Sequence, residues 1–187
     1  AAMDPDVSTI RITAYRMANN SKVINALINA ARNGKDVLVM LELRARFDEE
    51  NNLEWKERLE EEGVKVLLGL HNMKVHAKVC VIKKRVGKKI IQYGFVSTGN
   101  LNEKTATVYG DHCLLTSNRN IMADINRLFA FIQNPKNQAP LKACKTLMIC
   151  PTGMRKQIMS LINQEIKNAK LKKQASIIVK LNSLSDA

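Results

Sequence analysis

A continuous apolar run, Val37 to Leu41, is the feature that most constrains how this chain can fold. Five consecutive apolar residues favour a strand that is buried on both faces, and such strands belong to parallel sheets covered by helices. Apolar residues recur at helical spacing before the run, with Ser21 as the predicted N-cap of that helix and Gly34 as its end. The predicted elements here are strand 10–16, helix 22–33, strand 37–41, helix 48–62 and strand 64–70. This order predicts an α/β layer with parallel strands.

The rest of the sequence predicts further strands, a linker and the beginning of a second domain. Val86-Gly87-Lys88 indicates a hairpin, and Asn134-Pro135 ends a helix that Asn118 or Asn120 begins. The predicted elements are strands 73–84, 90–96 and 112–116 and a helix to residue 133, then strand 146–150, helix 155–169 and strand 176–181. We therefore predict one nearly whole domain at residues 1–135, followed by a linker and the truncated beginning of a second domain at 136–187.

The charge of the chain indicates a polyanionic partner. Lys and Arg number 30 against 17 acidic residues, which gives a formal net charge of +13. Such an excess favours nucleic acid, an acidic membrane surface or a phosphate-rich substrate. Aromatic residues make up only 4% of the chain, which argues against a single-strand binder built from base-stacking platforms. No apolar run approaches the ~18–20 residues of a membrane span, so we expect a soluble protein.

His76 and Lys78 form the strongest candidate site. On an extended strand 73–84 their side chains point to the same face. A neutral imidazole is a nucleophile near physiological pH, and an adjacent ammonium neutralises phosphoryl oxygens, so the pair suits attack on phosphorus. The turn 97–100 would bring backbone N–H groups and the Asn100 amide to the same phosphate. A lone His-x-Lys pair is more often a surface histidine beside solvated lysines, and the turn on the adjacent strand strengthens the functional interpretation.

The His-x-Lys pair with a later Gly-Asn resembles the phospholipase D superfamily. Six longer segments are more specific: ITAYR (12–16), ELRARFDEE (42–50), MKVHAK (73–78), TGNLNEKTA (98–106), YGD (109–111) and LLT (114–116). In this order and at this spacing they resemble the polyphosphate kinase family. The resemblance covers the first of that family's two C-terminal phospholipase-D-like domains and the beginning of the second. It implies a phospholipase-D-like α/β fold with a mixed, mainly parallel sheet flanked by helices.

The resemblance also implies a reaction: reversible transfer of the ATP γ-phosphate to inorganic polyphosphate through a phosphohistidine, with Mg²⁺ accompanying ATP. His76 falls on the phosphohistidine position, Tyr109 on a position that contacts the nucleotide, and Arg16 and Arg46 on positions associated with magnesium. A guanidinium has no lone pair with which to ligate Mg²⁺. We therefore expect both arginines to grip phosphate oxygens that also hold the metal.

The same resemblance shapes our expectations about activity and partners. The family's second essential histidine lies further along the second C-terminal domain, so we expect the chain to be an excised piece that is inactive alone. We expect ATP, ADP and polyphosphate as partners of a cytoplasmic, homo-oligomeric parent enzyme, without a specific nucleic acid or a membrane span. The basic runs 83–85 and 88–89 are typical of soluble edge protection, and in a polyphosphate enzyme they could guide the polymer.

Two other classes of function remain open on the residues alone. A phospholipase-D-like phosphodiesterase or nuclease shares the His-x-Lys pair and the basic surface, but needs neither ATP nor a metal ion. A non-catalytic polyanion-binding module needs only the charge of +13. Phosphate on His76 would separate the kinase from both.

Overall fold

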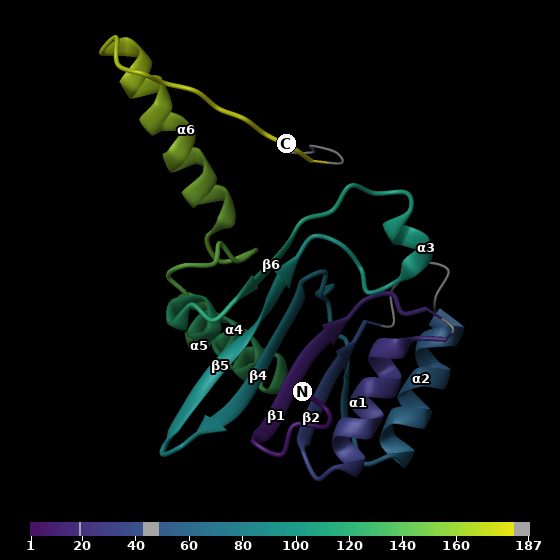
Figure 1. Cartoon of the computed structure of the whole chain (residues 1–187). Coiled ribbons are helices and arrows are strands. Elements are labelled where there is room, and N and C mark those ends of the chain that lie inside the picture. The colour runs from purple at the N-terminus through teal and green to yellow at the C-terminus, as the bar shows by residue number, and fades with distance from the viewer. Residues whose placement is uncertain (19, 43–48, 182–187) are drawn as a thin grey trace. The chain divides into compact units, whose positions relative to one another are not determined.

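The first 147 residues form a six-stranded mixed sheet with helices on both faces (Figure 1). This computed structural model describes residues 1–18, 20–42 and 49–181. The strands are β1 (Val7–Ala14), β2 (Asp36–Leu41), β3 (Lys65–Leu68), β4 (Lys78–Val86), β5 (Lys89–Ser97) and β6 (Cys113–Thr116), in the order β3-β2-β1-β4-β5-β6. Strand β2 pairs in parallel with β1 and β3, and the other pairs are antiparallel. The mixed, helix-flanked α/β sheet is confirmed, with parallel pairing limited to its first three strands.

The hairpin is the reason that parallel pairs do not predominate. Strands β4 and β5 are joined by the turn Gly87-Lys88, and Val86 pairs with Lys89 across it. Gly87 has a φ of 59°, a left-handed conformation that hairpin turns favour in glycine. A two-residue turn can join only antiparallel neighbours, and β6 then adds to β5 in the same sense.

The helices begin and end largely where the sequence predicts. They are α1 (Lys22–Arg32), α2 (Glu49–Glu61), α3 (Glu103–Ala106), α4 (Arg119–Gln133), α5 (Ala139–Lys142) and α6 (Met154–Lys170). The Ser21 hydroxyl accepts a hydrogen bond from the Ile24 N–H at 3.2 Å, and the Asn118 side chain caps α4 in the same way. Gly34, at a φ of 75°, follows the last turn of α1. No helix among the described residues is long and apolar enough to cross a membrane.

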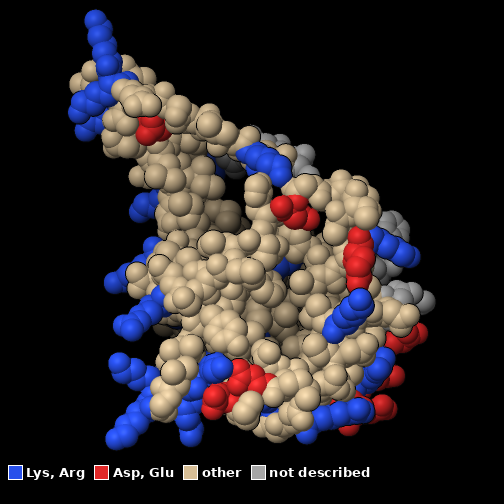
Figure 2. All heavy atoms as spheres, viewed as in Figure 1, with Lys and Arg blue, Asp and Glu red and all other residues tan. Residues whose placement is uncertain are grey.

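Charge is divided between the two edges of the sheet. Figure 2 shows acidic residues gathered at the side where α2 lies, whereas lysines and arginines gather at the end of the β4–β5 hairpin. The sequence of α2, EENNLEWKERLEE, carries the acidic excess, and the hairpin carries the runs 83–85 and 88–89. The hairpin therefore carries a local cluster of basic residues.

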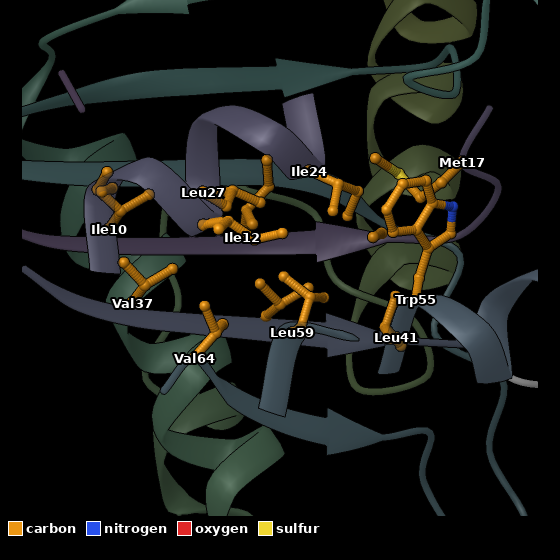
Figure 3. Packing of buried hydrophobic residues seen from close by; sticks show 14 of the residues in the cluster. Ile10, Ile12, Met17, Ile24, Leu27, Val37, Leu41, Trp55, Leu59 and Val64 are labelled. Carbon is orange, nitrogen blue, oxygen red and sulfur yellow. The ribbon is translucent and has the colours of Figure 1, made fainter. Parts of the chain in front are cut away.

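The main core lies between the sheet and the helices α1 and α2 (Figure 3). Strand β1 contributes its alternate residues, and β2 contributes Val37, Val39 and Leu41. Apolar residues of α1, spaced three and four apart, and Trp55 and Leu59 of α2 pack against them. The other face of the sheet is also covered, since α4 contacts β4 and β5. Strand β2 is thus buried on both faces, as its continuous apolar sequence predicts.

The predicted strands 146–150 and 176–181 are wrong, because neither segment is a strand in the structure. Their backbone donors have other partners. The N–H groups of Thr146 and Leu147 donate to the Asp124 carboxylate, and that of Ser176 donates to Glu165. A strand also needs a neighbouring strand, and the described part of the unit Met148–Ala187 contains only one element, the predicted helix, α6.

A buried carboxylate ties the segment 145–147 to α4. Asp124 Oδ2 accepts the N–H groups of Lys145, Thr146 and Leu147 at 3.1, 2.7 and 2.9 Å, and Oδ1 accepts from Arg127 at 2.6 Å. The chain accordingly divides into compact units after Leu147, whereas the predicted domain boundary after residue 135 stays a prediction. Burial alone would raise the Asp124 pKa, but these donors outweigh burial and hold the pKa below its usual value.

Replacing Asp124 with Asn should destabilise the first unit by about 2–3 kcal/mol, because an amide cannot accept all of these bonds. The folded-state pKa lies below the unfolded value of about 3.9, so this contribution is complete above that pH and is lost as pH falls through the lower folded value. Urea unfolding of both proteins between pH 2 and 7 measures the difference. A stability gap that does not narrow in acid would contradict this assignment.

Candidate functional site

His76 and Lys78 meet at the beginning of β4, beside the end of β1. Lys78 Nζ lies 3.0 Å from His76 Nε2 and donates to the His76 carbonyl oxygen at 2.8 Å. The Tyr15 ring meets the imidazole edge-on, with ring centres 4.7 Å apart and planes at 76°. Lys78 Nζ also lies 4.7 Å from the centre of the Tyr15 ring, within the range of a cation–π contact. The imidazole, the ammonium and the phenol ring therefore form one cluster.

The Thr13 hydroxyl holds the segment that carries this pair. Thr13 Oγ1 donates to the Ala77 carbonyl oxygen at 2.6 Å and accepts from the Val79 N–H at 3.0 Å. The regular strand therefore begins at Lys78, so the prediction that strand begins at Met73 is wrong for residues 73–77. The two side chains nevertheless lie on the same side, as alternation along an extended chain predicts.

Glu42 holds the same segment from the side of β2. Its carboxylate is buried, with 1% of the residue exposed, and Oε2 accepts the Val75 N–H at 2.8 Å. The backbone of Glu42 donates to Ala14 at 3.1 Å, and the Asn52 amide donates to the carbonyl oxygens of both Glu42 and Tyr15. The ends of β1 and β2 and the residue before His76 are thus joined in one polar network.

Crowding of positive charge alters both titrations at the site. His76 remains exposed, but its partial desolvation lowers its pKa, and the nearby charges of Lys78, Lys74 and Arg16 lower it further. Burial also lowers the pKa of Lys78 to about 8, where the attraction of Asp111 opposes the shift and Arg16 adds to it. At neutral pH the imidazole is therefore neutral and the ammonium is still mainly charged.

The contact between the two side chains also defines the imidazole tautomer. A lysine ammonium has three donors and no acceptor, so it needs the lone pair of His76 Nε2. The proton of the neutral ring then lies on Nδ1, and Nε2 is the nitrogen with an available electron pair. Lys78 covers this electron pair in the structure.

The structure brings Arg16 and the turn 97–100 to this cluster. Arg16 Cζ lies 6.0 Å from the centre of the Tyr15 ring, and its charge acts on both His76 and Lys78. Lys78 pairs with Ser97 across β4 and β5, so the turn begins directly beside the backbone of Lys78. The side-chain oxygen of Asn100 is buried and meets no donor in the part of the chain that the structure describes.

The turn itself requires glycine at position 99. A Cβ there would lie 2.4 Å from Asp111 Oδ2, a distance at which something must shift. Asp111 is held in this place by the Thr98 hydroxyl, which donates to Oδ1 at 2.9 Å and accepts the His112 N–H at 3.0 Å. Close approach of the carboxylate thus explains the glycine, and it also places a counter-charge near Lys78.

One residue that the resemblance suggested, Tyr109, is not brought into the cluster. Tyr109 follows α3 and is 47% exposed, and within the described residues its ring makes no contact with His76 or Tyr15. Arg46 lies outside the residues that the structure describes. Their roles stay predictions.

Sequence reasoning missed Tyr15, Glu42, Lys74 and Asp111 as parts of the site. Tyr15 had the clearest signal, since it lies at the end of a predicted strand in a chain with only three tyrosines. Aromatic residues at the carboxyl end of such a strand lie where α/β sheets place their ligand sites. The other three look like ordinary solvated charges in the sequence.

An α/β sheet with a basic His-Lys pair at one end is the arrangement of the phospholipase-D-like class of fold. Two family models match the chain: "Polyphosphate kinase C-terminal domain 1" at residues 1–138 and "Polyphosphate kinase C-terminal domain 2" at residues 147–187. The chain belongs to the polyphosphate kinase family, which confirms the resemblance read from its motifs.

Individual relatives agree with the family assignment. All of the chain aligns with polyphosphate kinases of Vibrio parahaemolyticus, at 45% identity over 186 residues, and of Escherichia coli K12, at 40%. It covers 26% and 27% of their lengths, so the chain spans about a quarter of these curated relatives. The crystal structure of polyphosphate kinase from Porphyromonas gingivalis is similar to the chain, with a TM-score of 0.78 and 41% sequence identity. The match covers 92% of this chain and 28% of the Porphyromonas gingivalis chain.

Replacing Lys78 with Met should raise the pKa of His76, because it removes a positive charge that favours the neutral imidazole. The measurement is an NMR titration of the imidazole C–H signals, with His76 assigned from the spectrum of His76→Asn among the three histidines. Lys84→Met is the matched control, since Lys84 pairs with Asp4 further along β4. An unchanged His76 pKa in Lys78→Met would contradict the electrostatic coupling.

Proposed function

We propose that this chain carries the phosphohistidine half of a polyphosphate kinase site, and that His76 receives the phosphoryl group. The single observation that carries the proposal is the contact of 3.0 Å between Lys78 Nζ and the unprotonated Nε2 of a neutral His76. It places a nucleophile and a phosphate-binding cation within reach of the same phosphorus atom. Membership of the family supports the choice of ATP and polyphosphate as the substrates.

The reaction then proceeds in two displacements. His76 Nε2 donates its electron pair to the γ-phosphorus of ATP, the bond from that phosphorus to the β–γ bridging oxygen breaks, and ADP leaves with the electrons. A terminal oxygen of polyphosphate next attacks the same phosphorus, the N–P bond breaks, and the electron pair returns to Nε2. Each displacement runs in reverse by the same atoms, so the transfer is reversible.

Lys78 has two duties in this scheme. In the ligand-free structure its ammonium covers the Nε2 electron pair. An arriving γ-phosphate offers it charged oxygens, which are stronger acceptors than a neutral ring nitrogen, so Lys78 turns to the phosphate and uncovers the nucleophile. The same ammonium then neutralises charge that develops on the phosphoryl oxygens.

The cations around Tyr15 suit a chain of phosphates better than a metal ion. Arg16, Lys74 and Lys78 lie within 6.0, 5.9 and 4.7 Å of the Tyr15 ring centre. Across residues 1–18, 20–42 and 49–181, no three His, Cys, Asp or Glu side chains gather as a metal-binding group. We assign Mg²⁺ to the substrate as Mg·ATP, and we assign the arginines at positions 16 and 46 to its phosphate oxygens, because a guanidinium can donate to phosphate but has no lone pair for the metal.

Asn100 and Tyr109 have supporting parts in the proposal. The buried Asn100 oxygen is an acceptor, and rotating the amide by half a turn would present its NH₂ group, the donor that a phosphate requires. Tyr109 offers an exposed aromatic face on the segment that leads to Asp111, and we assign this face to the nucleotide.

Replacing His76 with Asn should abolish the phosphoenzyme in a full-length polyphosphate kinase that carries this sequence. Asn retains hydrogen-bonding capacity but has no nucleophilic nitrogen, so no N–P bond can form. The measurement is mass spectrometry of the protein after incubation with Mg·ATP under conditions that preserve acid-labile phosphate.

His71→Asn is the matched control, because His71 is exposed and its replacement should leave the phosphoenzyme intact. Stoichiometric phosphohistidine in the His76→Asn variant would contradict the proposal. A phosphodiesterase would give no ATP-dependent phosphoenzyme with either protein, and a polyanion-binding module would bind polyphosphate without any covalent product.

Replacing Arg16 with Gln should lower the rate of polymer synthesis by ~30- to 1000-fold. This loss corresponds to about 2–4 kcal/mol of transition-state stabilisation, the contribution of one bidentate contact to phosphate. Lys at the same position keeps the charge without the two-pronged geometry, so it should restore only part of the rate. Initial rates of ATP-dependent polymer synthesis measure both effects. Arg32→Gln is the control, since Arg32 pairs with Glu62 at the C-terminal end of α1. Full activity in Arg16→Lys would show that charge alone suffices.

A further inference from the structure

A second group of cations lies at the other end of β4, far from His76. Residues Lys83 and Arg85 alternate along the strand and therefore point to one face of the sheet. On β1, Thr9 pairs with Lys83 and Arg11 pairs with Val81, so Arg11 lies on the same face, diagonal to Lys83. We call Arg11, Lys83 and Arg85 the basic row.

The basic row faces the side of the sheet that α4 covers. Gln92 is the cross-strand partner of Lys83, and its side chain accepts a hydrogen bond from Asn126 of α4 at 2.6 Å. The basic row therefore lies on the opposite face from the main core, whose β1 residues are Ile10 and Ile12.

Arg11 is the member that an ordinary surface patch does not explain. Its Nε atom is buried, and it has no hydrogen-bond partner within the residues that the structure describes. A buried donor on a charged group is costly unless an acceptor meets it, and such atoms are rare in folded proteins. An exposed lysine run can serve solubility alone, but a half-buried guanidinium without an acceptor is suited to an anion.

Two of the carboxylates near the basic row are already engaged in ion pairs. Asp36, at the register position of Thr9, pairs with Lys65 at 3.0 Å. Asp4 pairs with Lys84 at 2.6 Å, and Lys84 alternates to the other face. No ion pair joins the basic row to an acidic side chain within the described part of the chain. The row therefore keeps its positive charge available for a ligand.

We propose that the basic row is a second phosphate-binding surface, which holds a distal part of a long polyphosphate chain while the chain end reacts at His76. Choosing polyphosphate as the ligand rests on the proposed function. Lys78 and Arg85 are seven residues apart on one strand, about 23 Å at ~3.3 Å per residue, and this odd spacing turns their side chains to opposite faces of the sheet. A polymer that is long enough to cover this distance and to pass around the hairpin end of the sheet can engage both, whereas tripolyphosphate cannot.

Chain length is the property that this surface controls. A polymer held at two places on the same sheet gains affinity over one held at His76 alone, because the second contact is intramolecular. A short polyphosphate binds at only one of the two places at a time, so its affinity does not increase. The basic row therefore makes binding favour long chains without a new contact at the reacting phosphate.

The test is a binding titration of the 187-residue chain with long-chain polyphosphate and with tripolyphosphate, using the triple variant Arg11→Gln, Lys83→Gln, Arg85→Gln. Affinity for the long polymer should fall by roughly tenfold or more, since three surface charge contacts are lost together. The slope of log affinity against log salt should become shallower by about 2, taking the ~0.7 per contact of single-stranded nucleic acids. Affinity for tripolyphosphate should stay within about twofold, because a single site at His76 remains.

The matched control removes three lysines of α6, as Lys156→Gln, Lys167→Gln and Lys170→Gln, and so changes net charge equally in the other unit. Equal loss of long-chain affinity in this control would overturn the proposal in favour of net charge alone. Unchanged long-chain affinity in the triple variant would overturn it outright. If the triple variant unfolds at a lower temperature, the pair Lys83→Gln, Arg85→Gln decides the question with Arg11 in place.

The outcomes also separate this proposal from the proposed function. A length-dependent loss of binding without phosphohistidine on His76 would retain the polyanion surface and reject the kinase chemistry. Phosphohistidine with no length-dependent loss would retain the chemistry and reject the surface.

Discussion

The antiparallel addition of β4 to β1 is the constraint on which the site depends. Strands β1 and β2 run parallel, so their carboxyl ends meet at one edge, and β4 begins at that same edge because it runs the other way. The Thr13 hydroxyl replaces a regular ladder bond there, with contacts of 2.6 Å to the Ala77 carbonyl and 3.0 Å from the Val79 N–H. His76 therefore leaves the sheet at a place where Tyr15 is already positioned by the end of β1.

Charge at this edge costs stability in the ligand-free protein. Burial lowers the pKa of Lys78 to about 8, which means that folding disfavours its charged form. Since the folded pKa lies below the unfolded one, this penalty is present at neutral pH and is relieved as pH rises above about 8. Active sites commonly contain such unfavourable charge, and the binding of a ligand of opposite sign offsets the loss of stability.

The sequence predicted the elements whose signals are local. The apolar run of β2, the Ser21 cap of α1 and the glycine of the hairpin each act within a few residues, and the structure confirms all three. The prediction failed where distant side chains capture the backbone. Asp124 takes the N–H groups of a predicted strand that lies more than twenty residues away, and no periodic pattern reports this. The pair His76 and Lys78 was predictable from alternation, but the network around it was not.

The proximity of Lys78 to His76 has a consequence for substrate choice in the proposed reaction. A neutral ligand offers the ammonium nothing better than the Nε2 electron pair, so the nucleophile stays covered and unreactive. Water near the site meets the same covered nitrogen and gains no catalysis from it. A phosphate chain draws Lys78 away and is at the same moment held by Arg16 and Lys74, whose charges already act on the imidazole. Uncovering the nucleophile and binding the phosphate are therefore one event, which restricts attack to ligands with enough negative charge to compete for the lysine.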